Sequence, residues 1–303
     1  MSDDSLISVV IPHLNQEEAL GRCLESLYSQ QNVRSKFQII IADNGSPTLP
    51  SYPPNASIDV ALIQEKTPGP GPARNAGVAK SKGQLLAFID ADCTAHPLWL
   101  HTIEKAFQKH ERTVIGGEVL VAYVDPKRPS FLEPYEAIYS YRNNEHVASG
   151  FSGTGNLAMR REIFDIVGPF AGISVAEDRD WGFRAQAKGI VTEFVPNMIV
   201  YHPARKKFTE LKTKWDRHIA HDFKELDGLK GRVFWGIKTC IMTVSPLIEI
   251  GTIIRSPKVN GVSERWLAFQ CLVCIRFYRA WRMVCIVFAR NTEKSAQHWN
   301  RGE

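Results

Sequence analysis

The sequence has little of what marks several other classes of protein. Its 303 residues contain only six cysteines, and the single CxxC pair, Cys271 and Cys274, has no second pair with which to hold zinc. There is no internal repeat and no low-complexity segment. The first residues are acidic where a secretory signal peptide would be basic, so we expect a cytoplasmic protein with reduced thiols.

Strong charge is absent as well. The formal net charge is +5, which is too small to indicate nucleic-acid binding by itself, and we expect no such partner. With 44% hydrophobic and 23% charged residues, the composition is that of a globular protein. The length suits one large domain, or one domain with an appendage.

What is present is an alternation of short apolar runs with helical patterns. Strands are predicted at 8–12, 37–42, 60–63 and 84–89, and the helices between and after them are predicted at 17–30, from about 73, and at 96–110. This alternation indicates an α/β sheet with a largely parallel first half. Ligands of such sheets bind beyond the carboxyl ends of the strands, where Asp43 and Asp90 fall.

The pattern is less regular after residue 114. We expect a strand at 114–124, then a loop, a strand and a helix over 151–168, a helix ending at Gly189, and a last strand at 191–203. A catalytic domain is therefore predicted at 1–205, with a nucleotide-sugar half at about 1–115 and an acceptor half at about 116–205. Residues 206–303 form a separate helical region.

Two carboxylates follow the strand predicted at 84–89. Asp90 and Asp92 are separated by one residue, and the end of a buried strand would hold them rigidly. Such a pair suits a hard divalent cation, Mg²⁺ or Mn²⁺, which would screen the charge of a departing diphosphate. The plainer interpretation is that both residues cap a turn.

Three further positions carry suitable chemistry, each with an ordinary structural alternative. Asp43 could accept hydrogen bonds from a base or ribose, or form an Asx-turn. Arg74 and Asn75 begin a helix after a Gly/Pro-rich loop, where Arg74 could bind phosphate, pair with Asp43, or form a surface ion pair. Glu177 and Asp178 begin another helix and could supply a general base, or be ordinary first-turn residues.

In this order the features resemble a family. The first 205 or so residues are similar to a family 2 glycosyltransferase with the GT-A fold, a Rossmann-like, mostly parallel sheet flanked by helices. The pieces that carry the resemblance are SVVIPHLNQEEALGRCLESLYSQ, IIIADNGS, GPARNAGVAKSKGQLLAFIDADC, SGTGNLAMRREIF, AEDRDWGFRAQAKG and VYHP.

The resemblance implies an enzyme that transfers a sugar from a nucleotide-sugar donor with inversion, using a divalent metal ion. The donor side would include Asp43, which would bind the base, and the metal and diphosphate motif Asp90 and Asp92, with Arg74 and Asn75. Asp178, with Glu177, would supply the base that deprotonates the acceptor hydroxyl. The remaining correspondences are Gly155 and Asn156 on the loop before the acceptor, and His202 at the metal or diphosphate.

The sequence departs from the family pattern in three places. Cys93 follows the second aspartate, where the family often has an acidic or polar residue, and the first strand ends in His13 and Leu14, where an aromatic commonly precedes Asn15. The Q/R-x-x-R-W motif of processive members is absent, with at most a remnant around Trp215. This absence favours single transfers over polymerisation.

The C-terminal region predicts contact with a membrane surface. The apolar run 233–254 carries Lys238, Pro246 and Glu249, so it is not a clean transmembrane helix. In the second run, 266–289, helical spacing puts several arginines in one sector: Arg265, Arg276, Arg279, Arg282 and Arg290. We expect an interfacial helix with these arginines toward anionic headgroups, on the inner face of the membrane. Packing on the catalytic domain, or in a homodimer, is the alternative.

A peripheral membrane enzyme suits a lipid-linked saccharide acceptor in polysaccharide or glycolipid biosynthesis. Two other functions remain open at this point. A sugar-phosphate nucleotidyltransferase would share the sheet and the carboxylates, but it would need a Gly- and Arg-rich loop after the first strand, where this chain has HLNQEEAL. A non-catalytic protein that binds nucleotide sugar or membrane would not need Asp90, Asp92 and Asp178 together.

Overall fold

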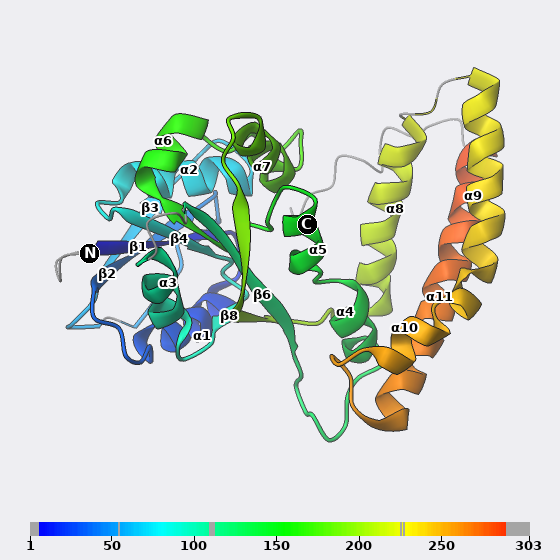
Figure 1. Cartoon of the computed structure of the whole chain (residues 1–303), viewed down its shortest axis with the longest axis horizontal. Coiled ribbons are helices and arrows are strands. Elements are labelled where there is room, and N and C mark those ends of the chain that lie inside the picture. The colour runs from blue at the N-terminus through cyan, green and yellow to red at the C-terminus, as the bar shows by residue number, and fades with distance from the viewer. Residues whose placement is uncertain (1–5, 54, 109–112, 225, 227, 289–303) are drawn as a thin grey trace. The chain divides into compact units, whose positions relative to one another are not determined.

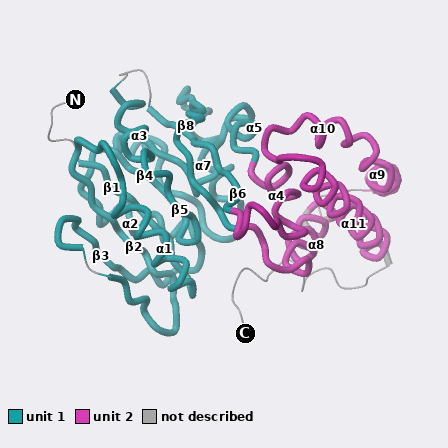
Figure 2. Tube along the Cα trace, turned by 90° about the horizontal axis from the view of Figure 1, so that it is seen from below, with its two compact units in different colours: residues 1–122, 142–203 teal, residues 123–141, 204–303 magenta. Residues whose placement is uncertain are grey.

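The structure, a computed structural model, describes residues 6–288 except 54, 109–112, 225 and 227. It divides into two compact units (Figure 2). Unit 1 comprises residues 1–122 and 142–203, and unit 2 comprises residues 123–141 and 204–303. The predicted boundary near residue 205 lies close to the crossing after Pro203, but residues 123–141, predicted in the acceptor half, cluster with the C-terminal helices.

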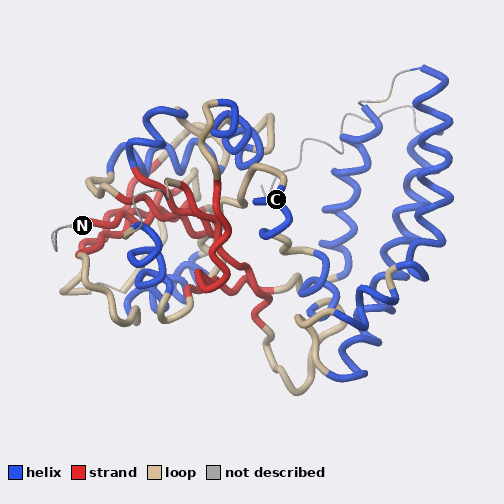
Figure 3. The backbone as a smooth tube through the Cα atoms, viewed as in Figure 1, coloured by secondary structure: helices blue, strands red, loops and turns tan. Residues whose placement is uncertain are grey.

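Unit 1 is a mixed α/β structure whose strands form its centre (Figures 1 and 3). Its first half alternates strands and helices as the sequence predicts. The elements are β1 (Leu6–His13), α1 (Glu17–Tyr28), β2 (Lys36–Asp43), β3 (Asp59–Gln64), α2 (Pro70–Lys80), β4 (Leu85–Ile89), β5 (Thr94–Ala95) and α3 (Trp99–Phe107). Helix α2 begins at Pro70, three residues before the predicted start, because proline fits the first turn of a helix, where its missing N–H is not needed.

The second half of unit 1 completes one eight-stranded sheet. Its elements are β6 (Val114–Ala122), α5 (Asn143–Ala148), β7 (Asn156–Arg160), α6 (Arg161–Val167), α7 (Glu177–Ala187) and β8 (Thr192–Pro203). The strand order is β3-β2-β1-β4-β7-β6-β8-β5. Strands β1 to β4 are parallel to one another, and β6 is parallel to β8. Strand β7 is antiparallel to both β4 and β6, and β5 is antiparallel to β8, so the sheet is mostly parallel but mixed.

Alternation along the strands builds two apolar layers, one on each face of the sheet. On one face, Val9 and its alternate neighbours pack with the predicted apolar faces of α1 and α3. On the other face, Val10, Leu86 and Phe88 pack with α2, α6 and α7, including the buried Trp181. Because both faces of β4 are covered, its five residues are all buried, and the first polar side chain after the strand is Asp90.

Unit 2 is helical. It consists of α4 (Glu133–Tyr139), α8 (Phe208–Lys224), α9 (Gly228–Ile248), α10 (Ile250–Arg255) and α11 (Gly261–Phe288). Helix α11 packs against α4, α8 and α9, and a small core joins α8, α9 and α11 around Trp235 and Met283. Cys271 is buried and Cys274 is exposed, and both are free thiols.

The predicted orientation of α11 is wrong. Its arginines turn into unit 2 and do not form an outward face, because each has a partner there. Arg276 lies 3.8 Å from Glu249, Arg279 stacks on Trp215, and Arg282 donates to Asp216 at 2.8 Å. Arg265 donates to the backbone carbonyls of residues 254, 256 and 261, and Arg290 lies outside the described residues. The exposed side of α11 is instead apolar, with Phe277, Trp281 and Val284.

Candidate active site

The acidic pair after β4 is connected to the start of α7 by one arginine. Arg74, on the first turns of α2, is 3% exposed. Its Nη2 donates to Asp90 Oδ1 at 2.6 Å and its Nη1 donates to Glu177 Oε1 at 2.8 Å. Three elements that are distant in the sequence therefore meet at a single guanidinium group. The alternative pairing of Arg74 with Asp43 is not what the structure shows.

The first two carboxylates of α7, Glu177 and Asp178, differ in their surroundings. Glu177 is largely buried, and burial raises its pKa although Arg74 opposes the shift. Asp178 is half-buried and accepts only the backbone N–H of Arg179, at 2.7 Å. Among the described residues it has no ion-pair partner. Asp178 lies in the first turn of α7, where the helix dipole favours a negatively charged group.

Gly155 makes room for Asp90. A Cβ atom at residue 155 would lie 2.6 Å from Asp90 Oδ2, closer than side-chain atoms can approach. The loop before β7 thus contacts one oxygen of the carboxylate while Arg74 binds the other. Neighbouring Asn156 is fully buried as the first residue of β7, where Trp99 Nε1 donates to its Oδ1 at 2.8 Å. Its Nδ2 donates to the carbonyls of residues 118 and 198, so its side chain ties the sheet together.

Asp92 and His202 form a candidate metal site. Asp92 Oδ2 lies 3.4 Å from His202 Nε2, and Cys93 Sγ lies 3.9 Å from Asp92 Oδ1. The ligand atoms of these three residues all fall within 4.8 Å of one another. Burial raises the pKa of Asp92, with His202 opposing and Asp90 adding to the shift, and burial raises the pKa of the Cys93 thiol well above its usual value. Hard cations prefer oxygen and nitrogen ligands to sulfur, so Asp92 and His202 are the better ligands of the three.

The tautomer of His202 fits a cation at this place. Its Nδ1 lies 2.7 Å from the carbonyl oxygen of Pro203, which only accepts, so Nδ1 carries the proton. In the neutral ring Nε2 is then an acceptor that faces the carboxylate of Asp92. A proton or a metal ion between the two removes their repulsion, and a backbone carbonyl on the far nitrogen is the usual arrangement of a metal-binding histidine. A carboxylate oxygen and an imidazole nitrogen are suitable ligands for Mn²⁺, and the carboxylate also suits Mg²⁺.

Asp43 is placed at the end of β2 as predicted, but its carboxylate is fully buried. Burial alone would raise its pKa. The hydrogen bonds from Ser46 and His13, with the backbone N–H groups of Gly45 and Ser46, outweigh burial and lower the pKa. Because Gln16 N–H donates to His13 Nε2 at 3.1 Å, His13 Nδ1 carries the proton that is donated to Asp43. The ionised carboxylate of Asp43 thus holds the turn at residues 44–46 in place through these hydrogen bonds.

Asn44 and Asn75 fix the loop that leads into α2. The Nδ2 group of Asn44 donates to the carbonyls of Glu65 and Thr67, and its Oδ1 accepts from Gly69 N–H at 2.7 Å. Asn75, predicted to contact the donor, exchanges two hydrogen bonds of 2.8 Å with the backbone of Phe170. Its amide connects α2 to the segment before α7, and so it helps to place Arg74 and Glu177 together.

Sequence reasoning missed His13 and Asn44. His13 is the last residue of β1 and Asn44 directly follows β2, at the same edge of the sheet as Asp90, and that position is the signal that could have identified them. The bridge from Arg74 to Glu177 spans 103 positions of sequence and has no local signal.

The family model for glycosyl transferase family 2 matches residues 8–180, more than half of the chain. The chain belongs to family 2 of the glycosyltransferases. This membership excludes the nucleotidyltransferase alternative, and the arrangement of Asp90, Asp92 and Arg74 lies within the matched segment.

Individual relatives agree with the family assignment. The chain is 31% identical over 218 residues to glycosyltransferase AglE of Haloferax volcanii, covering 69% of this chain and 70% of AglE. It is 26% identical over 172 residues to hyaluronan synthase of Pasteurella multocida, covering 52% of this chain but only 17% of the synthase. Among solved structures, mannosyltransferase PcManGT of Pyrobaculum calidifontis matches with a TM-score of 0.55 at 12% identity, covering 95% of this chain and 88% of PcManGT. This last likeness confirms the GT-A fold of the family 2 chain.

Proposed function

We propose that this enzyme transfers one sugar from a nucleotide-sugar donor to a hydroxyl group of a lipid-linked saccharide, with inversion and with the help of a divalent metal ion. The observation that carries the proposal is the Arg74 bridge, which brings the acidic pair after β4 and the acidic start of α7 into one site. The resemblance to PcManGT, whose structure holds GDP-Man and Mn²⁺, supports a nucleotide-sugar donor and a metal.

The reaction needs a base on one side of the donor sugar and stabilisation of charge on the other. Asp178 takes the proton of the acceptor hydroxyl, whose oxygen attacks the anomeric carbon as the bond to the diphosphate breaks. A single displacement inverts the anomeric configuration. Glu177 is held by Arg74 and positions the start of α7, and it is the second candidate for the base. Asp43, Asn75, Gly155 and Asn156 remain predicted site residues that shape the donor and acceptor loops.

The leaving diphosphate carries charge that the site must stabilise. A divalent cation held by Asp92 and His202, with Asp90 beside them, would supply this stabilisation when bound. Asp90 is oriented for the task by Arg74 on one oxygen and by the space at Gly155 beside the other.

Replacing Asp92 with alanine is expected to lower transfer by about 10²-fold or more, because a metal ion contributes several kcal/mol to such a reaction. The measurement is donor hydrolysis and transfer against a panel of nucleotide sugars with Mg²⁺ or Mn²⁺. Asp165→Ala, which removes an exposed carboxylate on α6, is the matched control and should leave both rates unchanged. Full wild-type activity in excess EDTA, with tightly bound metal excluded by elemental analysis, would contradict the metal role.

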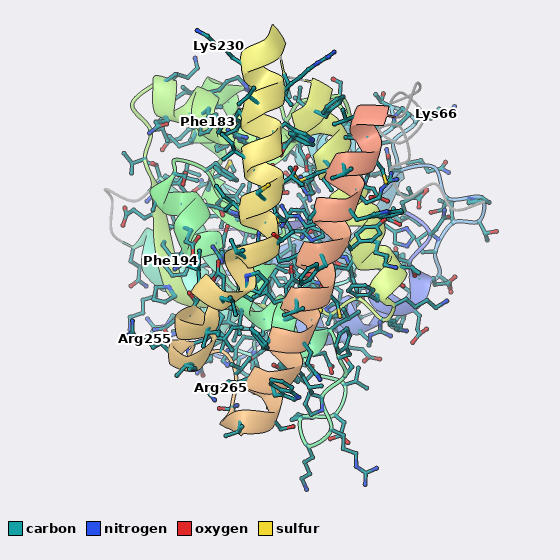
Figure 4. All side chains as sticks on the ribbon, turned by 90° about the vertical axis from the view of Figure 1, so that its right-hand side faces the viewer. Lys66, Phe183, Phe194, Lys230, Arg255 and Arg265 are labelled. Atoms are coloured by element: carbon teal, nitrogen blue, oxygen red, sulfur yellow. The ribbon has the colours of Figure 1, made fainter. Side chains whose placement is uncertain are left out.

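The apolar outer side of unit 2 supports attachment to a membrane. Among the described residues, one helical span, Lys230–Arg255, is long and apolar enough to cross a membrane by length and composition, and only 17% of its most apolar 18-residue stretch is buried. Its exposed residues recur at helical spacing, at Ile237, Ile241, Val244 and Ile248. Figure 4 shows α9 beside α11 on this side of unit 2, with Lys230 and Arg255 at the two ends of the apolar span. Helices of this kind suit a peripheral position on the inner face of the membrane.

Replacing Ile237 and Ile241 with glutamate should therefore release the protein from liposomes. Each side chain contributes about 1.5–3 kcal/mol when buried, so partitioning should fall at least about tenfold. The measurement is flotation with vesicles at low and high salt, and the apolar contribution should persist in high salt. The control is Thr209→Glu with Thr213→Glu, which adds the same charge to exposed positions of α8. A wild-type protein that does not float would instead indicate a dimer interface, which a mass measurement in solution would detect.

A further inference from the structure

Unit 2 contains a group of cations that no part of the proposed chemistry uses. We name Lys214, Arg217 and Arg279 the cation cluster. Lys214 and Arg279 lie over the ring of Trp215, a residue of α8 that the sequence marked only as a motif remnant, and the charge of Arg217 acts on Lys214. Arg279 Cζ lies 3.5 Å from the centre of the Trp215 ring, and Lys214 Nζ lies 5.9 Å from it. Helices α8 and α11 pack together here, so the cluster has a defined place in the fold.

The neighbouring carboxylates are committed to other cations. Glu136 binds both the guanidinium and the backbone N–H of Arg205. Asp216 accepts from Arg282 and from Tyr278, each at 2.8 Å, and Asp222 accepts from Lys238 at 2.8 Å. Within the described part of unit 2, Lys214 and Arg279 have no carboxylate within ion-pair distance.

The positive charges of the cluster destabilise one another. Burial, together with Arg205, Arg217 and Arg279, lowers the pKa of Lys214 to about 8, although Glu136 opposes the shift. Burial and Arg276 lower the pKa of Arg279 to about 10. The Nε group of Arg279 is buried and has no hydrogen-bond partner. An anionic ligand would neutralise these mutually repelling positive charges.

An apolar groove between α9 and α11 starts one helical turn beyond Arg279. Its volume is about 440 Å³, and its lining includes Phe223, Trp235, Met283, Val284 and Val287, with Arg232 at the side. Met283 is one turn beyond Arg279 on α11, which corresponds to about 6 Å along the helix. Phe223, on the same helix as Lys214, packs on Trp235 with ring centres 5.3 Å apart. The cationic and the apolar surface thus follow one another along α11, and α9 supplies the opposite side of the groove.

We propose that the cation cluster and this groove bind the lipid carrier of the acceptor, with its phosphate or diphosphate on the cations and part of its hydrocarbon chain in the groove. The charge of such a carrier complements the cluster, and its chain matches the apolar lining. The proposal rests on the proposed function for the identity of the carrier as the acceptor's lipid.

The test uses the full-length protein in neutral detergent, without donor. Geranylgeranyl phosphate is the probe, geranylgeraniol is the neutral comparison, and phosphatidylglycerol represents anionic lipid of the bilayer. Lys214→Gln with Arg279→Gln should weaken binding of the probe about 10- to 100-fold, since two hydrogen bonds to charged groups are lost. The control is Lys207→Gln with Arg255→Gln, which removes two exposed cations of unit 2 and should change binding less than about twofold.

Stability distinguishes a ligand site from a cluster that only holds the fold together. Removing a cation that is repelled in the folded state should raise the melting temperature, so Lys214→Gln should be more stable than wild type while it binds the probe more weakly. If the cluster only held the fold together, Lys214→Gln would instead lower the melting temperature. The pKa of Lys214 is lowered by folding, so wild-type stability should rise as pH increases from about 8 toward the ordinary lysine value, and this rise should weaken in Lys214→Gln.

Three results would overturn the proposal. They are equal binding of the probe by Lys214→Gln/Arg279→Gln and wild type, equal affinity for the probe and geranylgeraniol, and preference for phosphatidylglycerol, which would make this a site for bilayer lipid. Because no catalysis is measured, an Asp92→Ala protein should bind the probe like wild type. A wild-type protein that binds the probe but transfers no sugar from any nucleotide sugar would contradict the proposed function alone.

Discussion

Asp178→Asn is expected to lower the turnover of sugar transfer about 10²–10⁴-fold, the usual contribution of a positioned base. The substitution keeps the size of the side chain and its ability to accept the Arg179 N–H, so α7 should begin as before. Donor binding should change little, because the proton is taken from the acceptor. The measurement separates kcat from KM for each substrate and compares transfer with binding of a non-hydrolysable donor analogue.

Two neighbours provide the controls for Asp178. Asp180 is on the same turn of α7 but is paired with Arg184 at 2.9 Å, so Asp180→Asn should retain most turnover. Glu177→Gln should affect stability and donor affinity more than turnover, because Glu177 is held by Arg74. If Asp178→Asn turns over like wild type while Glu177→Gln does not, the base is Glu177 and the assignment of roles on α7 is reversed.

Local pattern was enough to predict the first half of unit 1. Continuous β-branched runs become buried strands, and neighbouring strands joined through a crossover helix are usually parallel. Strands β1, β2 and β4 pair in this way, which puts Asp43 and Asp90 at one edge. The apolar spacing of α1 and α3 likewise predicts the side that faces the sheet, and the structure confirms that Leu24 and Ile103 are fully buried.

Side-chain partners could not be predicted in the same way. Nothing in the sequence near Asn156 indicates that its amide binds the carbonyls of two other strands, because these carbonyls arrive only when β6 and β8 pair. The same is true of α11, where an arginine sector and an apolar sector both exist. Helical spacing identifies the two sectors but does not say which one faces inward. The partners of the arginines decide this: Asp216 on α8 accepts from Arg282, and Glu249, just before α10, lies near Arg276.

The short helices α4 and α5 were also missed. With seven and six residues they are too short for a periodic pattern to be distinguished from a loop. Their positions depend on tertiary contacts. Glu136 of α4 is fully buried against Arg205, and Asn143 of α5 donates to the carbonyl of Gly117 at 2.7 Å. The placement of residues 123–141 with the C-terminal helices follows from such contacts and has no sign in composition.

Arg74→Met is expected to destabilise unit 1 by about 3 kcal/mol and to lower transfer about 10²-fold or more. Loss of one partner from a buried ion pair typically costs about 3–5 kcal/mol, and the low end applies because the Asp90 side chain is 35% exposed and partly screened by water. Without the guanidinium, Asp90 and the start of α7 lose their common anchor, and small displacements of reacting groups have large effects on rate. Arg74→Lys keeps the charge but cannot bind both carboxylates in the same fork.

The pH dependence of Arg74→Met distinguishes the loss of an ion pair from a loss of packing. Arg74 opposes the burial that raises the pKa of Glu177, so the pKa should rise further in the variant. A carboxyl group whose folded pKa lies above its unfolded value destabilises the protein when ionised, so the deficit in unfolding free energy should be larger at about pH 8 than at about pH 5. Adding Glu177→Gln to Arg74→Met should recover part of the stability, and Arg22→Met, which removes an exposed pair with Glu18, should cost at most about 0.5 kcal/mol. A deficit that is the same at both pH values, or that Glu177→Gln does not reduce, would mean that Arg74 acts by packing and that the bridge does not hold the site together.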